Sequence, residues 1–193
     1  MRYFFLIAFA FSLAACQPAY LNGMPNENSP FFNIPVDSKL VLRSRLSVQA
    51  GDDGVYFQDG KAMRWSDVNI YRAYCALRIE NKQTPQTVTP DTFIVAKTYN
   101  ERFFKQVRGV EPVQVAATGR IWLGGVDLND RGDGGYDVMA MVMELRSARQ
   151  PQVSRLICAE WRVPQGSTYI TVAKTRQVLG DYFSLELAAP GAR

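Results

Sequence analysis

The chain has 193 residues, a length that fits one ordinary domain or one domain with tails. Its formal net charge of +4 is too small to indicate a polyanionic partner, and its 47% hydrophobic and 21% charged residues exclude wholesale disorder. The sequence contains no histidine. That absence excludes Ser-His-Asp and Cys-His catalysis, zinc–histidine sites and an imidazole pH switch.

The first sixteen residues have the pattern of an export signal. A positive charge comes first, and residues 3–13 are then apolar except for one serine. Because a transmembrane helix needs about 20 apolar residues, this run is too short to span a bilayer and indicates a secretory signal. The run closes with Leu13-Ala14-Ala15-Cys16, which resembles the lipobox of bacterial lipoproteins.

The resemblance implies that residues 1–15 are a signal peptide and that Cys16 is lipidated and becomes the new N-terminus. Several acyl chains, at about 0.8 kcal/mol per buried methylene, form a stable membrane anchor. Gln17 follows at the position where the lipoproteins that enteric-type bacteria retain at the inner membrane have Asp, so the resemblance implies the outer membrane. The alternative is an ordinary cleaved signal followed by a chance cysteine. A body facing the periplasm or the cell surface argues against nucleic acid as a partner.

Residues 16–37 are predicted to be a tether between the lipidated cysteine and the folded body. Prolines recur through this segment with asparagine, glycine and serine between them, a mixture that favours neither a helix nor a strand ladder. Its last part contains Phe31, Phe32 and Ile34, which are too apolar for a free linker. We therefore expect these three side chains to dock on the body.

Residues 38–193 show the period-two pattern of β-strands. In the first predicted strand, which begins near residue 39, the apolar residues at 40, 42, 46 and 48 share one face. Asp59-Gly60 is a two-residue hairpin signal, since both positions of that turn need a positive φ. Further strands are predicted over residues 71–80, 92–98, 113–115, 120–123, 136–145, 153–163 and 182–187.

Two features of the second half of the sequence, one strand and one helix, refine the predicted fold. Residues 136–145 are apolar on both faces, which predicts a central strand in a covered sheet. Thr171 is a predicted N-cap for a short helix that stops at Gly180. The fold class is therefore mainly β: a single β-sandwich or a partly open barrel of short antiparallel strands with one or two short helices.

Two cysteines remain once Cys16 is lipidated. Cys75 and Cys158 form an even pair in an oxidising compartment, which predicts a disulfide, with two separate buried thiols as the alternative. One observation opposes the bridge, because Cys75 lies on the apolar face of its predicted strand and Cys158 on the more polar face of its own. A β-bulge, or a sheet covered on both sides, would reconcile the two.

No metal, cofactor or catalytic motif is assigned. The loop from Asp127 to Gly135 has acidic and amide side chains among glycines, as a calcium loop does. However, Arg131 occupies a ligand position and Val138 stands where the closing Glu belongs, so the loop is interpreted as a glycine-rich hairpin turn. The sequence has no Ser-x-x-Lys spacing and no phosphate-binding glycine loop.

Two functional hypotheses follow. The first is a membrane-anchored envelope lipoprotein that acts as a non-catalytic structural or interaction module, with an envelope protein as partner, in an outer-membrane or periplasmic assembly. Beyond the export segment, the chain resembles only uncharacterised proteobacterial lipoproteins, which implies no function. The alternative is a cell-wall glycan hydrolase or glycan-binding protein that uses the strand carboxylates Glu80, Glu144 and Glu160. A glycosidase needs two carboxyl groups about 5–9.5 Å apart.

Overall fold

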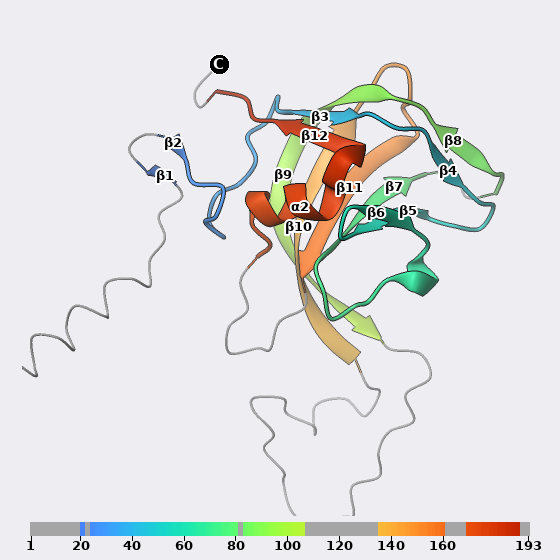
Figure 1. Cartoon of the computed structure of the whole chain (residues 1–193), viewed down its shortest axis with the longest axis horizontal. Helices are drawn as coiled ribbons and strands as arrows, with labels where there is room; N and C mark the ends of the chain where they lie inside the picture. The colour runs from blue at the N-terminus through green and yellow to red at the C-terminus, as the bar shows by residue number, and fades with distance from the viewer. Residues whose placement is uncertain (1–19, 22–23, 81–82, 107–134, 161–168, 190–193) are drawn as a thin grey trace, which may run out of the picture.

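A computed structural model describes residues 20–21, 24–80, 83–106, 135–160 and 169–189 (Figure 1). Its main element is an eight-stranded sheet in the order β12-β3-β9-β10-β11-β7-β5-β6, with every neighbouring pair antiparallel. In chain order these strands are β3 (Lys39–Leu42), β5 (Gly54–Gln58), β6 (Lys61–Met63), β7 (Tyr74–Ile79), β9 (Asp91–Gln106), β10 (Gly135–Arg146), β11 (Val153–Glu160) and β12 (Phe183–Glu186). The protein is therefore mainly β.

The sheet curls into a partly open barrel, which is one of the two architectures predicted from the sequence, the other being a β-sandwich. The helix α2 (Val172–Leu179) lies inside the curl, where it contacts β12, β5 and β7 (Figure 1). Aromatic rings join the two ends of the sheet: the ring of Phe57 on β5 lies 5.4 Å from that of Phe183 on β12 and 5.5 Å from that of Tyr182. The gap between the two ends of the described sheet is thus filled by α2 and packed side chains rather than bridged by a strand pair.

Smaller elements surround this sheet. β4 (Leu46–Val48) pairs with β8 (Gln86–Val88), and β1 (Tyr20–Leu21) pairs with β2 (Met24–Pro25). A 3-10 turn, η2 (Trp65–Asp67), follows β6, and a second one, η4 (Gly180–Tyr182), joins α2 to β12. The predicted strand that begins near residue 39 is in fact two strands, β3 and β4, in different sheets. Its face was predicted correctly, because the residues at 40, 42, 46 and 48 are all buried.

The short-range turn and cap predictions are confirmed. Asp59 and Gly60 both have a positive φ and connect β5 to β6. Thr171 caps α2, its side chain accepting a hydrogen bond from the backbone N–H of Lys174 at 3.2 Å. Gly180 follows the helix with φ +55°, and a Cβ atom there would lie 2.6 Å from Cα of Gly60. Glycine is therefore required where the β5–β6 turn meets the end of α2.

The end of the predicted tether is part of the folded body. Phe32 and Ile34 are 3% and 2% exposed, as expected, whereas Phe31 is 66% exposed and did not dock. Upstream of them, the Glu27 carboxylate lies 2.8 Å from Nε of Arg176 on α2, and the Glu27 carbonyl accepts from the backbone N–H of residue 173. The segment that packs on the body thus begins by residue 27, before the predicted boundary at 38.

Strand lengths differ most from prediction in the middle of the chain. β10 is central, between β9 and β11, as its two apolar faces predicted. β9 continues to Gln106, well past the predicted end at residue 98. Its residues from Ile94 to Gln106 are held in the sheet by pairing with β10. The predicted strands 113–115 and 120–123 lie outside the described residues.

Asp91 fixes the start of β9 against the turn between β10 and β11. Its carboxylate accepts hydrogen bonds from Ser147 Oγ at 2.7 Å, Gln150 Nε2 at 3.0 Å and the Thr92 backbone N–H at 2.8 Å. Burial alone would raise the pKa of Asp91, but these hydrogen bonds and the charge of Arg149 outweigh it and hold the pKa below its usual range.

Replacement of this carboxylate should make stability less sensitive to acid. Because the folded-state pKa of Asp91 is lowered, its stabilising contribution is present above about pH 4 and is lost as the pH falls through the folded-state value. Asp91→Asn should lower the free energy of unfolding by about 1–2 kcal/mol at pH 7, and urea titrations should show that deficit shrinking below about pH 4. Glu101→Gln, at an exposed position of the same strand, is the control. A deficit that stays constant down to pH 2.5 would contradict the prediction.

Candidate functional site

The two body cysteines lie directly opposite each other on neighbouring strands. Cys75 on β7 pairs with Cys158 on β11, their Cα atoms are 4.0 Å apart and their sulfurs 2.10 Å, and neither residue is exposed. The predicted mismatch of faces is resolved by an irregularity in β11 between Val153 and Arg155, which places Cys158 on the core side. The structure thus contains a cysteine pair in disulfide geometry.

The three glutamates of the glycan hypothesis are separated. Glu144 is opposite Arg155, and Glu160 lies five residues further along β11, about 16 Å away at roughly 3.3 Å per residue. Glu144 alternates with core residues and so lies on the convex face of the sheet, whereas Glu160 lines a pocket beside α2. Glu80 follows the far end of β7 and is exposed. The register therefore keeps Glu144 and Glu160 too far apart to form the predicted carboxylate pair.

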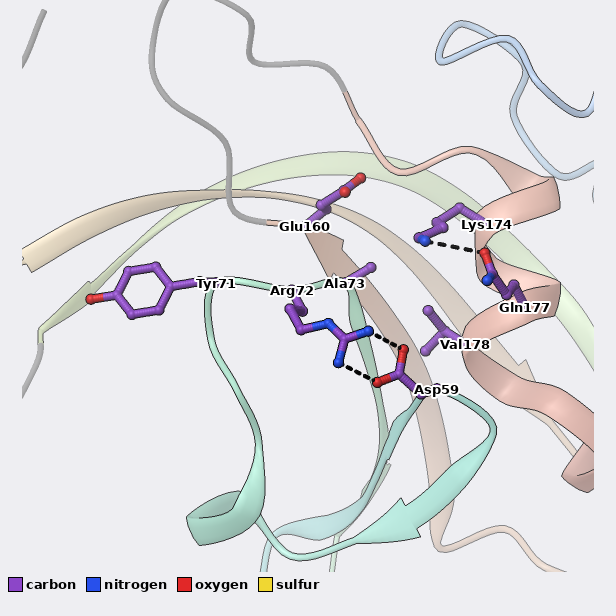
Figure 2. Close-up of a pocket in the computed structure, with 8 residues that line it drawn as sticks. All are labelled: Asp59, Tyr71, Arg72, Ala73, Glu160, Lys174, Gln177 and Val178. Carbon is purple, nitrogen blue, oxygen red and sulfur yellow. Dashed lines mark hydrogen bonds and ion pairs between the residues drawn. The ribbon is translucent and has the colours of Figure 1, made fainter. Parts of the chain in front are cut away.

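The pocket beside α2 is the candidate site. It has a volume of about 150 Å³ and lies where the β5–β6 turn, the chain before β7, the end of β11 and α2 meet (Figure 2). Its lining consists of Asp59, Tyr71, Arg72, Ala73, Glu160, Lys174, Gln177 and Val178. Sequence analysis singled out only two of these as chemically notable, Glu160 and the turn residue Asp59, since the lining comes from four separate segments that only the curl of the sheet brings together.

The charges in the pocket fall into two groups. Arg72 and Asp59 form a two-pronged ion pair, with Nη1–Oδ2 and Nη2–Oδ1 distances of 2.8 and 2.9 Å. Lys174 Nζ donates to the Gln177 side-chain oxygen at 3.1 Å. Figure 2 shows the Glu160 carboxylate directed away from the Arg72–Asp59 pair and the Tyr71 ring pointing away from the pocket. Both signs of charge therefore line a small hollow.

A second polar group lies on the convex face of the sheet. Tyr56 is almost fully buried, donates its hydroxyl to Asp53 at 2.8 Å and accepts from Arg78 at 2.9 Å, while Arg78 also forms an ion pair with Asp53. Burial raises the pKa of Tyr56. The rings of Trp65 and Tyr74 pack against that of Tyr56 at 5.2 and 6.5 Å. Since Asp53 and Tyr56 both satisfy Arg78, we interpret this group as structural.

Cys16 and residues 127–134 of the candidate calcium loop lie outside the described residues. Within the described ranges, no three acidic or cysteine side chains gather where they could hold a metal ion. In the same part of the chain, none of the helices is long and apolar enough to cross a membrane.

A scan against protein-family models and searches of curated proteins and of solved structures found no match for this chain. The functional argument therefore depends on the residues themselves.

Proposed function

We propose that this protein is a lipid-anchored lipoprotein of the outer membrane whose β-rich body serves as a non-catalytic interaction module for an envelope partner. The observation that carries the proposal is the Leu13-Ala14-Ala15-Cys16 sequence after an apolar run too short to span a bilayer. Gln17, in place of the Asp that retains such proteins at the inner membrane, supports the outer membrane.

Because Glu27 is held against α2, the segment between the lipidated cysteine and the folded body is short. Only ten residues lie between Cys16 and Glu27, and even a fully extended chain over those eleven steps spans at most about 40 Å. The β1–β2 hairpin lies within this interval and shortens it further. A body anchored in this way would stay close to the membrane surface, which favours a partner that is itself in or on that membrane.

The non-catalytic part of the proposal rests on the chemistry of the side chains. The sequence has no histidine, and the strand register separates Glu144 from Glu160 by about 16 Å, beyond the carboxylate spacing of glycosidases. The curled sheet, with the N-terminal segment docked on it, can present a surface to a partner. The glycan alternative predicts that the purified protein sediments with isolated cell-wall glycan, whereas the interaction module should not.

The anchor is tested by Cys16→Ala. This variant cannot be lipidated, so we expect it to move quantitatively from the outer-membrane fraction to the soluble periplasmic fraction with its melting temperature unchanged. Density-gradient fractionation of the exported protein measures the first effect and thermal unfolding the second. Gln17→Asp is the matched variant and, in an enteric-type host, should stay lipidated but shift to the inner membrane. Cys16→Ala protein that still fractionates with outer membranes would show that lipidation is not the anchor.

A further inference from the structure

Phe31 is the most exposed large apolar side chain in the described part of the chain. Its ring is 66% exposed, whereas Tyr71 and Trp65 are 63% and 39% exposed. The same segment buries Phe32 and Ile34 in the core and leaves this third large apolar side chain in solvent. Because single exposed apolar residues are common on protein surfaces, exposure alone does not indicate a role. Three further observations on this segment do.

The backbone around Phe31 is fixed by hydrogen bonds to a buried serine. Ser29 is fully buried, and its Oγ accepts from the Phe31 N–H at 3.2 Å. Its carbonyl accepts from the Phe32 N–H at 3.2 Å, and its own N–H donates to the Asn26 carbonyl at 2.9 Å. The ion pair between Glu27 and α2 holds the start of this turn on the body. The exposed ring is therefore presented by a folded turn.

The segment that carries Phe31 is almost free of charge. Residues 17–36 include a single charged side chain, that of Glu27, whereas the 21% charged content of the whole chain would place about four in twenty residues. The Glu27 carboxylate is itself neutralised by Arg176 at 2.8 Å. Since charged side chains are costly to remove from water, a segment of this composition is suited to contact with an apolar phase.

Phe31 is also close to the proposed lipid anchor along the chain. It follows Glu27 by four residues, so the two Cα atoms lie within about 14 Å of each other. Glu27 is in turn within about 40 Å of Cys16, even for a fully extended chain. If Cys16 is acylated, the membrane that holds its acyl chains is the apolar phase within reach of the Phe31 ring.

We infer that Phe31 inserts into the surface of that lipid bilayer and forms a second, non-covalent contact beside the acyl chains. The occupant of this surface is the interfacial layer of phospholipid, which shelters an aromatic ring from water. Because the ring lies on a turn fixed to α2, the contact sets the orientation of the β-rich body on the membrane. The inference rests on the proposed lipid anchor, which flotation of the protein with vesicles tests separately.

Site-specific fluorescence tests the contact in the lipidated protein, bound to vesicles of phosphatidylethanolamine and phosphatidylglycerol. Asn33→Cys, at an exposed position two residues after Phe31, carries the dye, and Ser47→Cys, at an exposed position of β4, carries it in the control. β4 and the β1–β2 segment lie on opposite sides of the body (Figure 1). A quencher attached to the lipid acyl chains should quench the dye at Asn33→Cys severalfold more strongly than the dye at Ser47→Cys, and aqueous iodide should show the reverse order.

Phe31→Ser shows whether the ring itself makes the contact. Burial of a phenylalanine side chain favours the inserted over the withdrawn state by about tenfold or more. In Asn33→Cys protein, Phe31→Ser should therefore lower acyl-chain quenching to the level seen at Ser47→Cys. Tyr71→Ser removes a ring of similar exposure elsewhere on the body and should leave the quenching unchanged. Since both rings are exposed, neither variant should shift the melting temperature.

Three results would overturn the inference. Equal acyl-chain quenching at Asn33→Cys and Ser47→Cys, in protein that floats with the vesicles, leaves the anchor in place and assigns Phe31 to a protein partner. Quenching at Asn33→Cys that persists with Phe31→Ser shows that the anchor alone brings the turn to the lipid. Protein that does not float with the vesicles lacks the anchor, and this result contradicts the proposed function as well.

Discussion

Removal of both body cysteines should destabilise the protein more than any surface change. For Cys75→Ala with Cys158→Ala, we expect the free energy of unfolding to fall by about 2–5 kcal/mol. Domains of this size lose about 2–4 °C of melting temperature per kcal/mol, so the shift is on the order of 4–20 °C. Thermal unfolding of the exported protein, followed by circular dichroism, measures it.

Two physical terms set this magnitude. The cysteines are 83 residues apart in sequence, and closure of a loop of that length removes roughly 4–5 kcal/mol of conformational entropy from the unfolded chain. Both residues are also fully buried in the core, so each alanine leaves a small unfilled space. The double variant avoids a leftover buried thiol, which a single replacement would create.

Two controls distinguish the effect of losing the disulfide from the effect of losing the lipid anchor. Cys16→Ala should not change the melting temperature, and the double variant should remain membrane-attached. Intact mass after alkylation gives an independent readout, because a formed disulfide leaves neither Cys75 nor Cys158 reactive without reductant. Two alkylated thiols in the non-reduced, natively exported protein would contradict the prediction.

The parts of the fold that depend on local chemistry could be predicted from the sequence. A residue such as Thr171 or Gly180 acts through the backbone within four positions, so the start and stop of α2 are visible in the sequence itself. The Asp59-Gly60 turn and the burial of alternate residues on β3 and β4 follow for the same reason. Strand order is different, because nothing local to β11 specifies that β7 lies beside it.

Long-range geometry accounts for the predictions from sequence that were wrong. The two faces assigned to Cys75 and Cys158 disagreed because a single irregularity in β11 shifts the alternation, and no turn residue in that stretch indicates it. β9 was predicted too short because its later residues are held by pairing with β10 rather than by their own apolar pattern. The pocket could not be predicted, since Arg72, Glu160 and Lys174 meet only after the sheet has curled around α2.

Phe57 should be the side chain on which closure of the barrel depends most. It lies on β5, next to one end of the sheet, yet its ring packs against those of Tyr182 and Phe183 at the other end. It is fully buried, so Phe57→Ala should remove about 3–5 kcal/mol from the free energy of unfolding. Phe57→Leu keeps most of the volume and should cost less than about 1.5 kcal/mol.

The elements in which amide hydrogen exchange rises distinguish a role of Phe57 in barrel closure from ordinary core packing. Since β12 packs against β5 through this ring contact and α2 contacts both strands, Phe57→Ala should raise amide hydrogen exchange in β12 and α2 as well as in β5. Phe31→Ala is the matched control, because that ring is 66% exposed and its loss should change stability by no more than about 0.5 kcal/mol. Exchange that rises in β5 alone would mean that the two ends of the sheet are held together by α2 without the aromatic contact.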